Sequence, residues 1–194
     1  MAAHLTLPIA LTWGRIVAIP LIIALFYLPY HWSDQAAGIL FALAGITDSF
    51  DGYLARKWGQ TTRLGEFLDP VADKLIVATA LVLIVFAAKQ EPRWVGVLTV
   101  LSAAVIIGRE IAISALREWM AEIGARKKVA VSGLGKFKTI LQIVGLSMML
   151  FRWNLWGIPI YEIGLGLTVI AAVLTLWSMI QYLRAAWPEL TAGH

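Results

Sequence analysis

Long apolar runs, separated only by short polar connections, follow one another along almost the whole chain. Of its 194 residues, 60% are hydrophobic and only 14% are charged, which is more apolar surface than a water-soluble domain of this length can bury. A helix needs about 20 consecutive, mostly apolar residues to cross a bilayer. The sequence therefore predicts an all-α integral membrane bundle of six transmembrane helices, at residues 7–29, 35–57, 66–88, 94–120, 134–152 and 159–186.

The chain shows no sign of a division into several domains. Its connections are short, and it contains no linker, low-complexity tract or clear internal repeat. We therefore expect a single transmembrane domain over residues 1–194. The absence of cysteine means that a bound metal would need oxygen or imidazole ligands.

Basic residues collect at one end of the predicted helices. Short connections rich in Lys and Arg stay on the cytoplasmic side of a membrane. The richer side carries Arg56, Lys57, Arg63, Arg117, Arg126, Lys127, Lys128, Lys136, Lys138 and Arg184. The opposite side carries Lys89, Arg93 and Arg152. This bias predicts a multi-pass protein of the cell inner (cytoplasmic) membrane, with both termini and the active site facing the cytoplasm.

Four aspartates lie inside segments that are otherwise apolar enough to span a membrane. Asp48 and Asp51 belong to the second predicted helix, and Asp69 and Asp73 to the third. An intramembrane carboxylate costs at least about 2.5 kcal/mol unless it is paired, hydrated or bound to a cation, so such residues usually have a function. Spacings of three and four residues place each pair on one helical face. The two faces can converge at one depth near the cytoplasmic side.

Carboxylates gathered in this way repel one another unless cations neutralise them. Hard oxygen ligands favour Mg²⁺ or Mn²⁺ over Zn²⁺, and acids from two helices could hold two such ions. The structural alternative is a set of helix-end acids that pair with Arg56 and Lys74. Gly52 and Gly65 lie close to the acids and would let a base or a pyrophosphate approach the backbone, while Arg56 could bind a phosphate with two hydrogen bonds.

Read together, these positions form the pattern D-x2-D-G-x2-A-R-x8-G-x3-D-x3-D. The pattern consists of Asp48, Asp51, Gly52, Ala55, Arg56, Gly65, Asp69 and Asp73. It resembles the signature of the CDP-alcohol phosphotransferases. The resemblance implies a homodimeric membrane enzyme with two divalent ions, for which Asp48, Asp51 and Asp69 are the principal ligands. It also implies that Asp73 is both general base and ligand, and that Gly52, Ala55, Arg56 and Gly65 shape the CDP pocket.

A finer resemblance extends over most of the chain. It includes Leu11-Thr12 with Arg15, Phe67–Lys74, Arg109–Ile111, Ser114–Glu118 and Gly135–Thr139. These segments are similar to bacterial members of the family that transfer the phosphatidyl group of CDP-diacylglycerol to glycerol 3-phosphate, giving phosphatidylglycerol phosphate and CMP. The partners implied are these two substrates and membrane lipid, with no nucleic acid.

Cations outside the signature indicate where the phosphate of an acceptor would bind. Arg109 lies within the fourth predicted helix, Lys136 and Lys138 begin the fifth, and Arg15 in the first could join them. A buried arginine needs an anion. Adjacent helical residues point about 100° apart, so Glu110 is a poor candidate and a bound phosphate is favoured.

Two other functions fit parts of this pattern. An enzyme of the same family could use serine, inositol phosphate or phosphatidylglycerol as its acceptor, because the signature does not distinguish them. A divalent-cation transporter would also have intramembrane aspartates. A transport path, however, should place polar residues at successive depths, whereas these acids share one depth. Release of CMP from CDP-diacylglycerol would distinguish the enzyme from the transporter.

Overall fold

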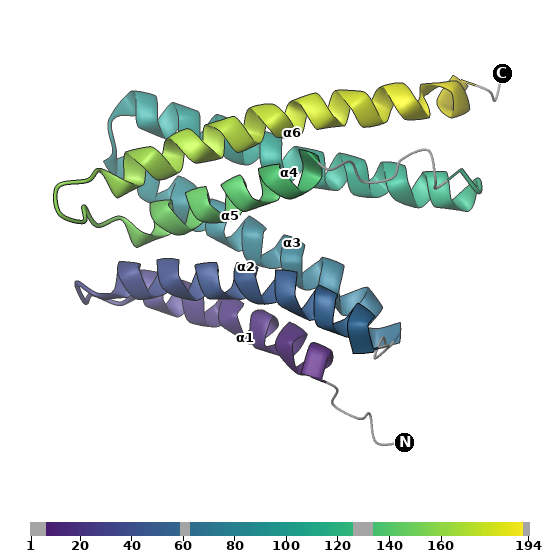
Figure 1. Ribbon diagram of the computed structural model, residues 1–194. Coiled ribbons are helices and arrows are strands. Elements are labelled where there is room, and N and C mark those ends of the chain that lie inside the picture. Colours follow the sequence, from purple (N-terminus) through teal and green to yellow (C-terminus); the bar gives the residue numbers. More distant parts are fainter. Residues whose placement is uncertain (1–6, 59–62, 126–133, 192–194) are drawn as a thin grey trace.

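The computed structural model is a bundle of six long helices (Figure 1). It describes residues 7–58, 63–125 and 134–191, with side chains for 10–47, 65, 67–125 and 137–191. The helices are α1 (Leu7–Tyr27), α2 (Ser33–Trp58), α3 (Arg63–Ala87), α4 (Arg93–Glu122), α5 (Leu134–Phe151) and α6 (Ile160–Thr191), and a short 3-10 helix η1 (Ala88–Gln90) precedes α4. The prediction of an all-α bundle is confirmed.

The predicted helix positions agree with the structure to within a few residues, apart from the end of α6. This helix continues to Thr191 instead of ending near residue 186. Just before these additional residues, α6 packs against the end of α4, where Met120 and Ala186 are fully buried in a small second core. Arg117 supports this contact because its guanidinium lies 5.3 Å from the ring centre of Tyr182. These contacts hold α6 against α4 as far as Ala186, and the residues beyond it continue the same helix with mostly exposed side chains.

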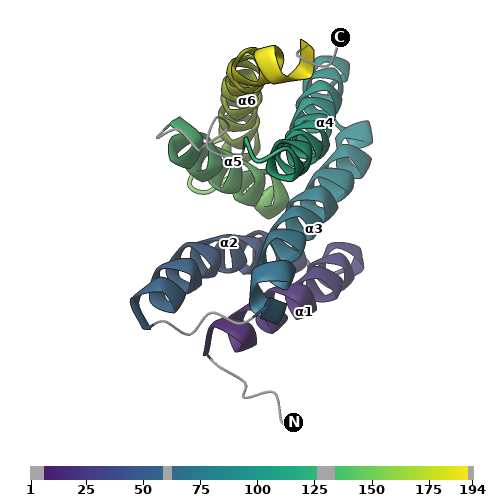
Figure 2. The same cartoon turned by 90° about the vertical axis from the view of Figure 1, so that its right-hand side faces the viewer.

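The helices form two groups that α3 connects. Figure 2 shows α1 and α2 on one side, α4, α5 and α6 on the other, and α3 running between them. In Figure 1, α1, α3 and α5 begin at the same end of the bundle at which α2, α4 and α6 finish. Among the described residues, Arg117, Lys138 and Arg184 lie in the parts of α4, α5 and α6 nearest this common end. The remaining connections lie at the opposite end.

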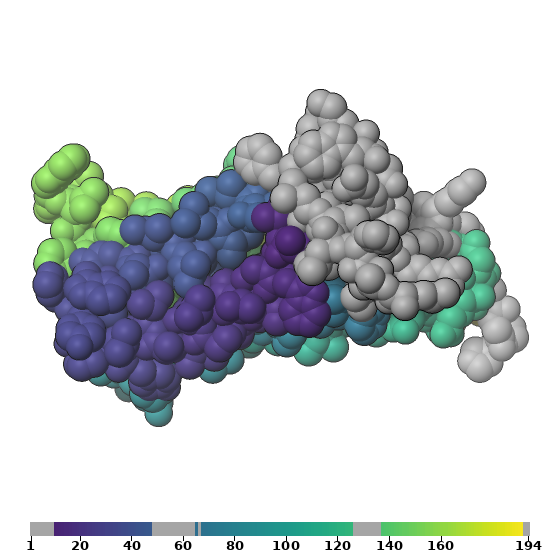
Figure 3. Space-filling view, turned by 90° about the horizontal axis from the view of Figure 1, so that it is seen from below, coloured from purple at the N-terminus to yellow at the C-terminus, as the bar shows by residue number. Residues whose placement is uncertain are grey.

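The outer surface of the bundle is apolar, as expected for a protein in lipid. Along α1, which forms one face of the molecule with α2 (Figure 3), Trp13, Val17 and Leu21 are about half exposed. Among the described residues, four helices have stretches long and apolar enough to cross a membrane: Ala10–Tyr27, Phe67–Gln90, Arg93–Glu122 and Ile160–Thr191. The apolar part of α5, Phe137–Phe151, is shorter. The chain is therefore a multi-pass membrane protein.

The interior joins the two helix groups through one main core. Its members come from α1 to α6, and the largest fully buried side chains include Phe41, Ile22, Leu81, Ile84, Ile106, Leu146, Met149 and Leu150. This core occupies the middle of the bundle and the half away from the common end. The polar groups that follow lie between it and the common end of the helices.

Helices α5 and α6 approach closely because both carry glycine at their contact. A Cβ atom added at Gly145 would lie 2.6 Å from the hydroxyl oxygen of Thr168 and 2.9 Å from the carbonyl oxygen of Gly164. One added at Gly164 would lie 2.8 Å from the carbonyl oxygen of Gly145. Small residues at such positions allow two membrane helices to pack backbone against backbone.

Gly145→Ala is therefore expected to destabilise the protein by about 1–3 kcal/mol, because the added methyl group has no space. Gly166→Ala is the matched control, since a Cβ atom there meets no atom within 4 Å among the described residues. It should leave the stability unchanged or raise it slightly. Thermal unfolding in detergent measures both variants. Equal Tm values for the two would contradict the packing described.

Candidate active site

A cavity of about 670 Å³ opens between the two helix groups. Side chains from α1, α2, α3, α4 and α5 line it. Its charged residues are Arg15, Asp73, Lys74, Arg109, Glu110, Glu118 and Lys138. Phe41, Val77, Ile106 and Ile143 form part of its apolar wall, nearer the middle of the bundle. The cavity can thus hold a ligand with both a charged and an apolar part.

Helix α1 contacts the two aspartates of α3. The hydroxyl of Thr12 donates to Asp69, and the guanidinium of Arg15 donates to Asp73. Thr12 and Arg15 are almost fully buried, with exposed fractions of 1% and 3%. The three-residue spacing in α1 and the four-residue spacing in α3 place both contacts on facing helical surfaces. The acids of α3 are therefore held in place from one side by α1.

The remaining residues of the signature lie on α2 and at the start of α3. Asp48, Asp51, Gly52, Ala55 and Arg56 belong to the helical backbone of α2, but their side chains lie outside the described residues. Gly65 is buried in the first turn of α3. Among the described side chains, no three acids or histidines lie close enough together to hold a metal ion. The four-aspartate metal site therefore stays a prediction.

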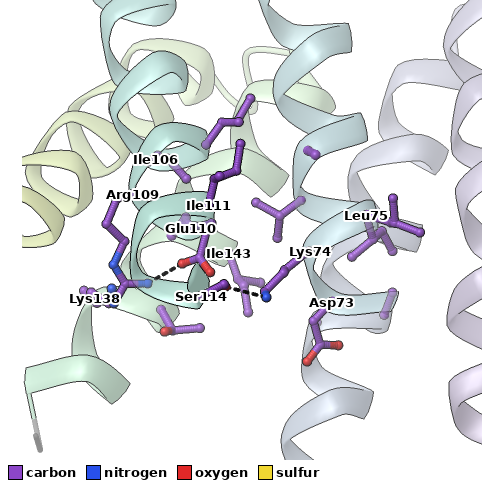
Figure 4. A pocket seen from close by; sticks show the side chains of 18 of the residues that line it. Asp73, Lys74, Leu75, Ile106, Arg109, Glu110, Ile111, Ser114, Lys138 and Ile143 are labelled. Atoms are coloured by element: carbon purple, nitrogen blue, oxygen red, sulfur yellow. Dashed lines mark hydrogen bonds and ion pairs between the residues drawn. The ribbon is translucent and has the colours of Figure 1, made fainter. Parts of the chain in front are cut away.

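The pair Arg109 and Glu110 corrects one step of the sequence argument. We expected these neighbours to point apart, yet Nη1 of Arg109 donates to the carboxylate of Glu110 inside the cavity (Figure 4). Both side chains are long enough to bend toward each other from different directions on the helix. Glu110 nevertheless does not satisfy the whole guanidinium, because Nε of Arg109 is buried without a hydrogen-bond partner among the described residues.

Lys138 brings a second buried cation from α5 to the same part of the cavity. Its exposed fraction is 6%, and it is close enough to Arg109 and Glu110 for their charges to act on it. Arg15 also lines the cavity, but it contacts Asp73 and so serves the acidic side of the site. The side chain of Lys136 lies outside the described residues. Of the predicted acceptor cations, Arg109 and Lys138 therefore lie together.

The structure adds polar residues to which the sequence had given no role in the site. Nζ of Lys74 lies 2.6 Å from the hydroxyl oxygen of Ser114, so this contact joins α3 to α4 across the cavity. Glu118 lines the cavity one turn beyond Ser114. The four-residue spacing of Glu110, Ser114 and Glu118 forms a polar stripe on an otherwise apolar helix. That stripe is the signal by which sequence reasoning could have found them.

Comparisons with known proteins identify the family of the chain. The family model described as CDP-alcohol phosphatidyltransferase matches residues 5–179. The chain is 52% identical to the CDP-diacylglycerol–glycerol-3-phosphate 3-phosphatidyltransferase of Escherichia coli (strain K12), over 95% of this chain and 96% of the relative. The protein of the same description in Salmonella choleraesuis (strain SC-B67) is 50% identical over the same shares. The chain therefore belongs to the CDP-alcohol phosphatidyltransferase family.

Proposed function

We propose that this protein is a membrane enzyme that transfers the phosphatidyl group of CDP-diacylglycerol to glycerol 3-phosphate, producing phosphatidylglycerol phosphate and CMP. One observation carries the proposal: a single cavity contains an aspartate of the family signature, Asp73, and a separate pair of buried cations, Arg109 and Lys138. Asp73 belongs to the chemistry that the whole family shares. The cation pair suits an acceptor that carries a phosphate. The names of the relatives describe the same two substrates.

The acidic side of the site suits a divalent metal. Asp69 and Asp73 are one turn apart on α3, and carboxylate oxygens are the ligands that Mg²⁺ and Mn²⁺ prefer. In our proposal Asp48, Asp51, Asp69 and Asp73 hold two such ions. When bound, these ions supply positive charge that neutralises the oxygens of the donor pyrophosphate. Gly52, Ala55, Arg56 and Gly65 shape the CDP pocket.

In the proposed reaction Asp73 accepts the proton of the primary hydroxyl of glycerol 3-phosphate. The hydroxyl oxygen then attacks the phosphorus that carries diacylglycerol. A new phosphorus–oxygen bond forms, the bond to the CMP oxygen breaks, and CMP leaves. Arg15 contributes by holding the Asp73 carboxylate from the α1 side. The general-base role requires the hydroxyl to lie within hydrogen-bond distance of Asp73 and the proton transfer to be assisted by metal or to occur late in the attack.

The basic side of the site would fix the other end of the acceptor. A phosphate can replace Glu110 on Arg109 and contact Lys138 at the same time, because both side chains line the same part of the cavity. Lys136 would assist from the start of α5. Serine has no phosphate for these cations, so the cation pair favours glycerol 3-phosphate over serine.

The orientation and assembly follow from the sequence arguments. The cations at the common helix ends support a site that faces the cytoplasm from the inner membrane. The family resemblance supports a homodimer.

Substitution of the basic residues tests the acceptor site. Arg109→Ala, Lys136→Ala and Lys138→Ala are each expected to raise the KM for glycerol 3-phosphate about 10- to 100-fold, since each removes a charge-assisted hydrogen bond of about 1.5–3 kcal/mol. The KM for CDP-diacylglycerol should change much less. Steady-state kinetics in mixed micelles measures both constants.

Arg93→Ala is the matched control for Arg109→Ala, because Arg93 belongs to the same helix but is exposed at the opposite end of the bundle. It should leave both KM values unchanged. Equal effects of Arg109→Ala on both substrates would mean that this cation serves the donor or the fold.

A further inference from the structure

Glu110 binds the guanidinium of Arg109, which is the group that the acceptor phosphate would need. In the cavity its carboxylate accepts a hydrogen bond from Arg109 (Figure 4), and Glu110 also lies near enough to act on Lys138. A carboxylate and a phosphate compete for the same guanidinium donors. The acceptor phosphate can therefore use all the hydrogen-bond donors of Arg109 only if Glu110 releases the one that it holds.

The two partners differ in how firmly they are held. The side chain of Arg109 is 9% exposed, whereas that of Glu110 is 35% exposed. Surface-exposed ion pairs are weak and exchange easily with solvent, while a buried arginine has little freedom to move. Glu110 is thus the partner that moves. Figure 4 shows its carboxylate on the side of α4 that faces Ser114 and Lys74, so a cation lies on the side to which it could turn.

The charges decide which ligands can displace Glu110. A phosphate monoester carries about −1.5 to −2 charges at neutral pH, against −1 for a carboxylate, and it offers three acceptor oxygens. A phosphate therefore competes well for Arg109. A neutral alcohol has no charge with which to compete. An amino acid carboxylate carries the same single charge as Glu110 and so has no advantage over it.

We propose that Glu110 is a specificity-determining residue: an internal competitor that holds Arg109 until a phosphate monoester displaces it. The proposal rests on the proposed function, because it assumes that Arg109 binds the acceptor phosphate. It goes beyond that function because it assigns Glu110 the role of competing with the phosphate for Arg109. Glu110 lowers the affinity of Arg109 for every anion by a similar factor, so that the phosphate monoester, which binds Arg109 most strongly, keeps a useful affinity while singly charged anions bind too weakly to compete.

The test is Glu110→Gln, which keeps the size of the side chain but removes its charge. We expect the KM for glycerol 3-phosphate to fall about three- to fivefold, the range expected when a partly exposed ion pair no longer competes. Inorganic phosphate should become a stronger competitive inhibitor by a similar factor. Binding of inorganic phosphate to the purified protein without CDP-diacylglycerol, measured by calorimetry, should tighten in parallel. The Tm should change little, since Glu110 is partly exposed.

Glu118→Gln is the matched control, because Glu118 lines the same cavity two turns further along α4 and has no hydrogen bond or ion pair to Arg109 among the described residues. It should leave phosphate binding unchanged. Glu110→Asp, which keeps the charge on a shorter side chain, should give a KM between those of the wild type and Glu110→Gln.

The direction of the change separates this proposal from a supporting role. If Glu110→Gln binds phosphate as weakly as the wild type or more weakly, Glu110 only orients Arg109 and the proposal is wrong, while the proposed function stands. If neither protein binds inorganic phosphate or glycerol 3-phosphate at all, the acceptor site itself is wrong. The proposed role of Glu110 then fails with it.

Discussion

Replacing Asp73 by Asn is expected to lower kcat by about 10²- to 10⁴-fold, the contribution of a general base to a proton transfer. Asn has nearly the same shape but cannot accept the acceptor's proton as a carboxylate does. The protein should still fold, because the Asp73 side chain is 39% exposed and the ion pair with Arg15 that the variant loses is only partly buried. Release of CMP from CDP-diacylglycerol under saturating substrates measures the change.

Asp34→Asn serves as the matched control for Asp73→Asn. Asp34 lies in the first turn of α2, at the end of the bundle opposite to the cavity. Its replacement can cost about 0.3–1 kcal/mol of stability through the helix dipole, but it should leave kcat unchanged. Near-normal turnover of Asp73→Asn would remove Asp73 from the role of base.

Removal of divalent metal is expected to stop the reaction completely and reversibly. Chelation should abolish CMP release, and added Mg²⁺ or Mn²⁺ should restore it, because the carboxylates need a cation to bring the donor pyrophosphate close. Asp69→Ala should lose most activity and regain little of it at high metal concentration. The metal concentration that gives half-maximal activity is the measurement.

Glu118→Ala provides the comparison for Asp69→Ala, since Glu118 lines the cavity next to Asp73 but lies outside the signature. Its metal dependence should equal that of the wild type. Full activity after exhaustive chelation would contradict the two-ion scheme, and an unchanged metal dependence of Asp69→Ala would exclude this residue as a ligand.

The fold could be predicted from the sequence because a membrane imposes a simple length rule. Each spanning helix needs one apolar run, so the runs gave the order and approximate bounds of all six helices. The end of α6 was missed by five residues, which continue a helix that a tertiary contact anchors at Ala186. Nothing in the local pattern shows that Ala186 will pack against Met120 in α4.

Asp69 and Asp73 could be singled out in the sequence because a carboxylate in an apolar segment is costly and therefore conspicuous. Their partners could not. Whether Thr12 and Arg15 face α3 depends on the rotation of α1 about its own axis, and this helix is apolar on most sides. The contact between Lys74 and Ser114 depends likewise on how α3 and α4 pack.

The prediction for Arg109 failed in an instructive way. Its place in a cavity with Lys138 is as expected, but its separation from Glu110 is not. Helical geometry fixes the directions of Cα–Cβ bonds and leaves the ends of long side chains free to meet. Because the two side chains were expected to point apart, the sequence argument did not recognise Glu110 as a competitor of the acceptor phosphate.

The most direct test of the account offers the purified protein CDP-diacylglycerol, Mg²⁺ and one acceptor at a time, and identifies the lipid formed by mass spectrometry. The acceptors are glycerol 3-phosphate, serine, inositol phosphate and phosphatidylglycerol. The account predicts phosphatidylglycerol phosphate, in equal amount to the CMP released, with glycerol 3-phosphate alone. A different lipid product from another acceptor, or divalent-cation transport into vesicles without any release of CMP, would contradict it.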